Sequence, residues 1–243
     1  MRLSRGRLDF DAYKDTYRDE VERSISFIGR DLDFFTELKA HVLLRIAREL
    51  LEDTKSLKAL DVGCGVGSTD SLLAPNFREL YGVDVAQQVV DVAARRNPSV
   101  AYSVCDTSAL PFDDDVFDLV FAINVFHHVQ PPERLPLFKE LARVAGDRGL
   151  VTVFEHNPLN PLTRLAVDRC EFDVDAVLIS NRELTRMFKL AGLQPLERSY
   201  IVFFPWRGRL LRAIERQLSW LPFGAQHVVA GRSLSFAPIT QAG

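Results

Sequence analysis

Glycines at alternate positions form the first group of residues that could serve a ligand. Strand-like residues 57–62 lead into Gly63, Gly65 and Gly67, and a helical pattern opens at Ser68. Alternate glycines let the backbone turn tightly and let a ligand approach where a side chain would collide. The G-x-G-x-G spacing differs from the G-x-G-x-x-G of pyrophosphate binders. This loop therefore favours a ligand other than a dinucleotide, although the glycines could also serve only a tight turn.

Carboxylates follow or end the neighbouring strand-like segments. Asp61 precedes the glycines, and Asp84 comes roughly 20 residues beyond the loop, where a carboxylate can accept bonds from ribose hydroxyls. Asp106, after the third segment, could accept a hydrogen bond from an adenine amino group. Three acids would repel a pyrophosphate and suit a cationic nucleoside, which disfavours a dehydrogenase. The alternative for Asp84 is an ordinary cap on the helix that follows.

His127 and His128 lie just after the fourth strand-like segment, residues 119–122. At the carboxyl edge of a parallel sheet, either imidazole could take a proton from an acceptor hydroxyl. His156, past the fifth segment, is a third candidate. The alternative is that these histidines only pack and bond to backbone. We recognise no cluster with metal-ligand spacing.

Short β-branched runs alternate with helical patterns from residue 57 onward, which indicates βαβ units and a parallel sheet. We therefore expect one domain, 1–243, with a helical cap at 1–52, a ligand-binding core at 53–155, and acceptor-side elements with the last strands at 156–243. The expected strands cover residues 57–62, 79–83, 101–104, 119–122, 149–154, 196–204 and 226–231. The expected helices cover residues 68–73, 86–96, 132–144, 181–191 and, as an insertion, 206–221.

The chain resembles the class I S-adenosylmethionine-dependent methyltransferases, in particular their small-molecule, type 11-like group. The resemblance covers residues 57–154 and rests on residues 60–68, 81–86, 105–112 and 117–129. It implies a Rossmann-like α/β fold with a seven-stranded, mostly parallel sheet and an antiparallel last strand. It also implies S-adenosylmethionine as the cofactor, held by residues from four motifs and from a tyrosine lid: Asp61, Gly63, Gly65, Gly67, Asp84, Val85, Asp106, Thr107, Asn124 and Tyr17.

Two further segments have sequence patterns that suggest a function. Tyr13 and Tyr17 share one helical face and resemble the lid tyrosines of relatives, although that helix could simply pack on the domain edge. Residues 206–221 combine a leucine-rich side with several arginines, as in a helix that lies on an anionic membrane surface. The alternative for this helix is a core-facing apolar side with a solvated arginine side.

Composition narrows the class of protein. A net charge of -3 gives no field that would gather nucleic acid, so we expect no nucleic-acid partner. Three widely spaced cysteines suit reduced thiols, and no secretory signal or membrane-spanning run is visible, so we expect a soluble cytoplasmic protein. The expected function is methyl transfer to a small or lipid-linked metabolite, most often on oxygen. The alternative is a non-catalytic regulatory protein that binds S-adenosylmethionine. The acceptor and the oligomeric state stay open.

Overall fold

The computed structural model describes residues 32–233 apart from residues 52, 107, 108, 171, 172, 205 and 207. Its centre is a seven-stranded sheet in the order β3-β2-β1-β4-β5-β7-β6. Strand β7 is antiparallel to both of its neighbours, and the other pairings are parallel. The strands are β1 (Lys58–Val62), β2 (Glu79–Asp84), β3 (Ala101–Val104), β4 (Leu119–Ile123), β5 (Leu150–His156), β6 (Leu193–Ile201) and β7 (Gln226–Ser233). This arrangement confirms the predicted Rossmann-like sheet.

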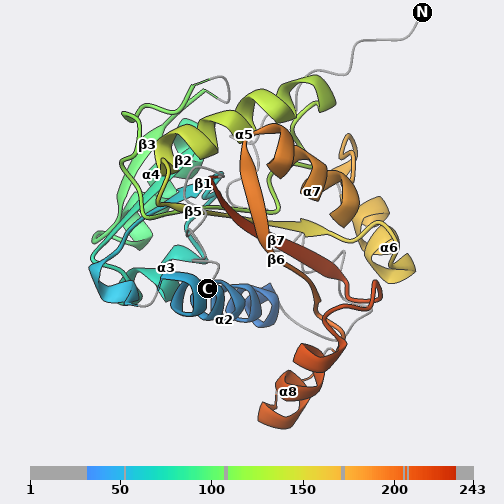
Figure 1. The fold of residues 1–243 in the computed structure, drawn as a ribbon. Helices are drawn as coiled ribbons and strands as arrows, with labels where there is room; N and C mark the ends of the chain where they lie inside the picture. The colour runs from blue at the N-terminus through green and yellow to red at the C-terminus, as the bar shows by residue number, and fades with distance from the viewer. Residues whose placement is uncertain are drawn as a thin grey trace, which may run out of the picture.

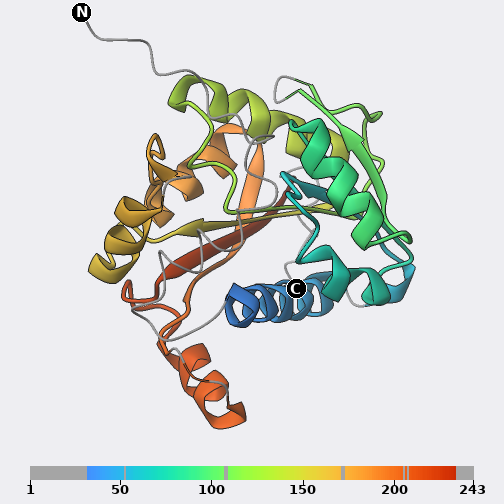
Figure 2. The ribbon, with the colours of Figure 1, turned by 180° about the vertical axis from the view of Figure 1, so that it is seen from behind.

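Helices cover both faces of the sheet (Figure 1). The α-helices are α2 (Leu32–Leu51), α3 (Asp70–Leu73), α4 (Gln87–Arg96), α5 (Pro131–Ala145), α6 (Pro161–Arg169), α7 (Asn181–Leu190) and α8 (Arg209–Leu218). Two short 3-10 helices, η3 (Thr54–Ser56) and η4 (Ala74–Asn76), flank β1 and α3. Figure 2 shows from behind that α2 and α3 lie on one side of the sheet and α5 and α7 on the other.

The central strands are buried on both faces, as the unbroken apolar run of β4 requires of a parallel sheet. Side chains of a strand alternate between faces, so Leu119 and Phe121 pack with α2 in one apolar cluster. Val120 and Ala122 pack with α5 and α7 in a second cluster. The two clusters hold β4 rigidly in place, which fixes the position of the loop that follows it.

The strand order reverses between β1 and β4, because β1 pairs with β2 on one side and with β4 on the other. Ligands of open α/β sheets bind outside the carboxyl ends of the strands at such a switch point. The glycine loop after β1 is tied to this edge, since the N–H groups of Gly63 and Cys64 both donate to the carbonyl of Val83, at 2.8 and 3.0 Å. The fold therefore brings the loops after β1, β2, β4 and β5 to one edge.

Sequence reasoning missed helix α6. No helix was expected between residues 154 and 181, but Asn160 caps one by accepting the N–H groups of Leu162 and Thr163, at 2.9 and 3.1 Å. Pro161 occupies the first turn, where its missing N–H costs nothing. The Asn160-Pro161 pair is thus a start signal that the sequence did contain. Strand β6 also begins and ends earlier than predicted, at Leu193 and Ile201.

Helix α8 is shorter than the predicted 206–221 helix and extends away from the sheet (Figure 1). Among its described side chains none is buried, and Ile214 is 39% exposed. The exposure of these side chains favours the membrane-surface interpretation, and the role of this helix stays a prediction.

Several predictions lie outside the described residues: Tyr13, Tyr17, Thr107 and most of the helical cap, of which α2 is described. The assignment of 1–243 to one domain stays a prediction. Within the described part of the chain, no helix is both long enough and apolar enough to cross a bilayer.

Candidate active site

The three loop glycines all have positive φ angles, 76° at Gly63, 54° at Gly65 and 69° at Gly67. A Cβ on Gly63 would lie 2.4 Å from a methyl of Val125, and one on Gly67 would lie 2.5 Å from the side-chain nitrogen of Asn97. A Cβ on Gly65 would meet nothing within 4 Å. Gly63 and Gly67 therefore serve close packing, whereas Gly65 presents bare backbone to open space, as a ligand cradle requires.

Asp84 closes the glycine loop from the end of β2. One carboxylate oxygen accepts the N–H of Gly65 at 3.0 Å, and the other accepts the N–H of Ala86 at 3.2 Å. A carboxylate offers about four lone-pair positions, so both oxygens can still accept bonds from ligand hydroxyls. Asp84 thus fixes the backbone of the glycine loop at the carboxyl end of β2. Its predicted role as ribose ligand fits this geometry and stays a prediction.

Asp61 is not an exposed acid at the sheet edge. It is 3% exposed, and it lies beside the fully buried Asp70, whose carboxylate accepts the hydroxyl of Tyr102 at 2.6 Å. Burial and then the charge of Asp70 raise the pKa of Asp61 well above its usual value. The argument that three ionised acids favour a cationic ligand therefore overstated the negative charge at Asp61. Asp61 Oδ1 has no hydrogen-bond partner among the described residues.

The remaining predicted cofactor residues lie at the same edge. Val85 is 42% exposed, directly after Asp84, and Asp106 is exposed after β3. Asn124 follows β4 with a φ of 58°, and its side chain accepts from Gln226 at 3.4 Å. The roles of these residues stay predictions.

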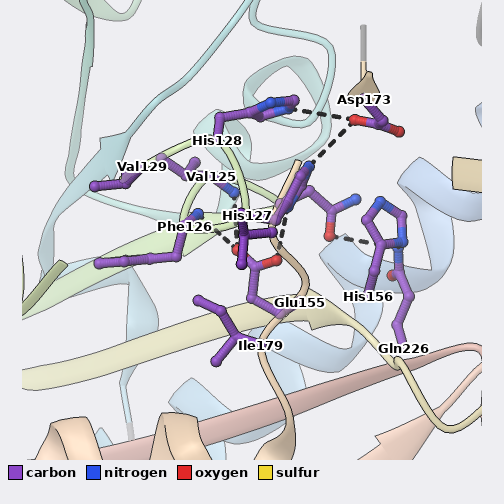
Figure 3. Close-up of polar contacts among 12 residues, drawn as sticks. Val125, Phe126, His127, His128, Val129, Glu155, His156, Asp173, Ile179 and Gln226 are labelled. Carbon is purple, nitrogen blue, oxygen red and sulfur yellow. Dashed lines mark hydrogen bonds and ion pairs between the residues drawn. The ribbon is translucent and has the colours of Figure 1, made fainter. Parts of the chain in front are cut away.

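His127 is held between two carboxylates (Figure 3). Its Nδ1 lies 2.7 Å from Glu155 Oε2, and its Nε2 lies 3.4 Å from Asp173 Oδ1. His128 Nε2 lies 3.5 Å from the same Asp173 oxygen. His127 is 2% exposed, whereas the side chain of His128 is 25% exposed. We define His127, His128, Asp173 and Glu155 as the histidine–carboxylate cluster.

The cluster has strongly perturbed pKa values. Burial lowers the pKa of His127, but Glu155 and Asp173 outweigh burial and raise it to about 9. Burial and the neighbouring His127 lower the pKa of His128 to about 4. Burial opposes ionisation of Glu155 and Asp173, yet His127 brings both pKa values down to about 2. Opposite shifts in adjacent titratable groups are typical of functional sites.

Sequence reasoning did not single out Glu155 or Asp173. Glu155 did carry a signal, because a charged residue within the apolar run of a central parallel strand is buried unless the strand ends there. The carboxylate of Glu155 accepts the backbone N–H groups of Val125 and Phe126, at 3.1 and 2.7 Å, so it shapes the histidine loop. Nothing in the sequence around Asp173 indicated a role in the site, because its place beside the histidines depends on how the segment after α6 returns to the sheet.

A cavity of about 480 Å³ opens beside the cluster, which is within the usual range for small-molecule sites. It is lined by Pro158, Arg164, Val167, Asp168, Asp173, Val174, Ala176 and Leu178. Its walls come from α6 and from the segments on either side of it. A helix that the sequence analysis did not predict therefore lines the cavity next to the histidines.

Comparison with known proteins agrees with this geometry. The family model described as "Methyltransferase domain" matches residues 60–153, from β1 into β5. The probable tRNA methyltransferase 9B of Mus musculus is 36% identical over 124 residues, which cover 50% of this chain and 26% of that protein. The 2-methyl-6-phytyl-1,4-hydroquinone methyltransferase of Synechocystis is 28% identical over 182 residues, which cover 68% of this chain and 57% of that protein. The matches thus span from about a quarter to just over half of these relatives' lengths.

The fold is shared with solved structures. A chain in the complex between the Haloferax volcanii Trm112 methyltransferase activator and a methyltransferase superposes with a TM-score of 0.67. It is 19% identical and covers 94% of this chain and 99% of that chain.

Sheet order, glycine loop and family match together define a class I S-adenosylmethionine-dependent methyltransferase. Residues 60–153 match the methyltransferase-domain family, whose methyl donor is S-adenosylmethionine. The predicted resemblance and fold are confirmed, and the family match agrees with the predicted enzyme class and cofactor. The expectation of no nucleic-acid partner has less support than the charge suggested, since a probable tRNA methyltransferase is among the relatives.

Proposed function

We propose that this chain methylates an oxygen of a small amphipathic acceptor, such as a phenol or alcohol carrying a lipid tail. The observation that carries the proposal is the histidine–carboxylate cluster next to a cavity with both charged and apolar walls. Arg164 and Asp168 can orient a polar head group, while Val167 and Val174 offer apolar contact. The similarity to a methyltransferase named for a phytylated hydroquinone supports an acceptor of this kind.

The donor supplies a methyl group on a sulfonium, whose carbon–sulfur bond breaks with its electron pair passing to sulfur as the new carbon–oxygen bond forms. The chain's residues must hold the acceptor oxygen about 3 to 3.5 Å from that carbon and remove the hydroxyl proton. His128 is the more accessible of the two predicted catalytic histidines, so we assign it the proton. His127, nearly closed off from solvent between two carboxylates, positions the loop.

The distance between the two loops supports this assignment. Val125, two residues before His127, lies against Gly63 so closely that a Cβ there would be 2.4 Å from it. The cluster therefore adjoins the glycine loop, where the donor's methionine part is predicted to lie.

The test is methyl transfer from isotopically labelled donor to a panel of acceptors, with products identified by mass spectrometry. We expect a methylated product from a prenylated hydroquinone or similar phenol, and loss of that product in His128→Ala. Labelled tRNA instead would favour a nucleic-acid substrate, as in the relative named for tRNA. No product from any acceptor, with S-adenosylhomocysteine still bound, would favour the regulatory alternative.

We further propose that the chain acts in the cytoplasm and contacts a membrane surface through α8 and its flanks. The three cysteines, Cys64, Cys105 and Cys170, form no disulfide with one another, which suits a reducing compartment. Large apolar side chains gather on α8, on the residues that follow it and at the start of α6. Those more than one third exposed are Leu159, Leu162, Leu165, Trp206, Ile214, Trp220 and Phe223.

The two parts of this apolar surface are joined by hydrogen bonds. The side chain of Asn160 donates to the carbonyl of Phe223 at 2.7 Å, and that of Asn157 donates to the carbonyl of Pro222 at 3.0 Å. Arg216 of α8 has a side chain 69% exposed and pairs with Glu49 at 3.5 Å, so its guanidinium lies at the surface. Exposed tryptophans with nearby arginine favour an anionic lipid interface.

Vesicle sedimentation tests this contact. We expect binding to phosphatidylglycerol vesicles that weakens several-fold in Trp220→Ala combined with Phe223→Ala, and that falls as salt rises. Leu190→Ala removes a comparably exposed side chain, 53%, from α7 and is the control. Equal binding by all three proteins would contradict the proposal.

A further inference from the structure

Three side chains of the histidine–carboxylate cluster direct potential metal-ligand atoms at one another. They are Nε2 of His127, Nε2 of His128 and an oxygen of Asp173, and all lie within 4.8 Å of one another. The two nitrogen–oxygen separations are 3.4 and 3.5 Å. Figure 3 shows both rings turned toward the same carboxylate oxygen. The ligands come from the loop after β4 and from the segment after α6.

These separations match a tetrahedral metal shell better than a hydrogen-bond network. Zinc binds histidine nitrogen and carboxylate oxygen at about 2.0 to 2.2 Å, so two ligand atoms of a tetrahedron lie about 3.4 Å apart. A hydrogen bond between nitrogen and oxygen is shorter, about 2.7 to 3.2 Å. By contrast, the bond from His127 Nδ1 to Glu155 measures 2.7 Å. The same ring thus makes one tight hydrogen bond and one contact at ligand–ligand spacing.

Glu155 completes the arrangement expected around a ligating histidine. Such a histidine almost always donates its second ring nitrogen to a carboxylate or a carbonyl, which fixes the ring and makes the ligand more basic. Glu155 accepts from Nδ1 of His127, and its other oxygen is held by the N–H of Phe126 at 2.7 Å. Glu155 is fully buried and Asp173 is mostly buried. A divalent cation would balance these two negative charges.

We propose that His127, His128 and Asp173 bind a divalent transition-metal ion of the zinc type, with a fourth position open toward the cavity beside Asp173. Three protein ligands with one open position are the pattern of catalytic rather than structural zinc sites. As a Lewis acid, the ion would lower the pKa of an acceptor hydroxyl bound there, and the proton would pass to solvent in the cavity before the methyl group is transferred. His128 would then be a ligand instead of the base. This use of the ion rests on the proposed function, but the binding itself does not.

Sequence spacing does not reveal this set, because Asp173 is far from the histidines along the chain. The cavity wall supplies a matched control, since Asp168 lines the same space but belongs to no ligand set. The test uses the full chain after dialysis against a chelator. Zinc is titrated by calorimetry, and cobalt is titrated by visible absorption, which distinguishes tetrahedral from octahedral coordination.

We expect one equivalent of metal, an intense tetrahedral cobalt spectrum, and loss of both in His128→Ala and in Asp173→Asn. Glu155→Gln should weaken binding by about 10- to 100-fold, as for other carboxylates that support a ligating histidine. Asp168→Asn should bind as the wild type does. A thermal shift with S-adenosylhomocysteine confirms that each variant is folded.

The metal site is rejected if chelated wild-type protein that still binds S-adenosylhomocysteine takes up no stoichiometric metal. It is also rejected if Asp173→Asn and His128→Ala take up metal as the wild type does. Methyl transfer that persists undiminished after chelation would reject the catalytic use of the ion. Metal uptake without methyl transfer to any acceptor would leave the site standing and overturn the proposed function instead.

Discussion

Glu155 Oε2 lies 2.7 Å from His127 Nδ1, and both side chains are almost completely buried. The other oxygen of the same carboxylate accepts two backbone N–H groups, so one side chain of β5 fixes both the conformation of the loop after β4 and the direction of the histidine ring. Strand pairing between β4 and β5 sets the distance across which this bond forms.

Glu155→Gln should lower the free energy of unfolding by about 1 to 3 kcal/mol, because it weakens a buried, charged hydrogen bond. The measurement is urea unfolding followed by circular dichroism. Glu183→Gln is the control, since Glu183 is 47% exposed and lies 3.8 Å from Arg134. A change within about 0.5 kcal/mol is expected there. Equal effects of the two substitutions would show that the buried hydrogen bond between Glu155 and His127 adds nothing to the stability of the fold.

Asp84→Ala should weaken binding of S-adenosylhomocysteine by more than about tenfold, a loss of roughly 1.4 kcal/mol. The carboxylate accepts the N–H of Gly65, the loop glycine at which an added Cβ would meet open space. Calorimetry measures the affinity. Asp91→Ala, on the exposed face of α4, removes a carboxylate that only accepts from Gln87 and should leave affinity unchanged. Wild-type affinity in Asp84→Ala would remove Asp84 from the site.

Comparing Gly65→Ala with Gly192→Ala distinguishes the effect of backbone strain on stability from an effect on ligand binding. Gly65 and Gly192 both have positive φ angles, 54° and 81°, and an added Cβ meets nothing within 4 Å at either one. Each alanine should therefore cost about 1 kcal/mol of stability through strain alone. Only Gly65→Ala should also reduce the thermal shift produced by S-adenosylhomocysteine. The same shift in both variants would show that the ligand does not approach Gly65.

Lys39 should make stability depend on pH in the alkaline range. Burial lowers its pKa to about 8, despite the opposing charges of Glu155 and Asp61, and His156 faces the same region. Between that value and the usual 10.5, the unfolded chain binds the extra proton, so this group's contribution to stability rises with pH across that window.

The difference in unfolding free energy between wild type and Lys39→Met should therefore increase from pH 8 to pH 10. Comparing the two proteins cancels the titration of other groups. Lys189→Met, which removes an exposed lysine of α7, is the control and should give a constant difference. A constant difference for Lys39→Met as well would show that Lys39 titrates normally.

The sheet and the cofactor loop could be predicted because their signals are local. Alternate glycines and an acid at the end of the following strand stand close together in the sequence, and unbroken apolar runs identify parallel strands. The acceptor side could not be predicted in the same way. Asp173 meets the histidines because the segment after α6 returns to them, where the N–H of Val177 donates to the carbonyl of His127 at 2.8 Å. Asp61 was counted as an ionised acid because strand position alone does not show that it is buried beside Asp70 of α3 and Lys39 of α2.

Helix α8 shows a further limit of prediction from the sequence. Its leucines and arginines have the pattern of a helix packed on a core, and only the packing of the rest of the molecule decides whether a core is available to it. Glu215 ties it to the chain before it, by accepting the N–H groups of Phe203 and Phe204 at 2.8 and 3.1 Å. The sequence pattern alone fits both outcomes.

The contact between Gly63 and Val125 couples the glycine loop, where the donor is predicted to bind, to the loop that carries the histidines. Because no space exists between these residues for even a methyl group, a shift of the donor-binding turn must be transmitted to the segment that carries the histidines. Donor occupancy and acceptor geometry should therefore change together, and substitutions in either loop should produce correlated rather than independent defects in the two steps.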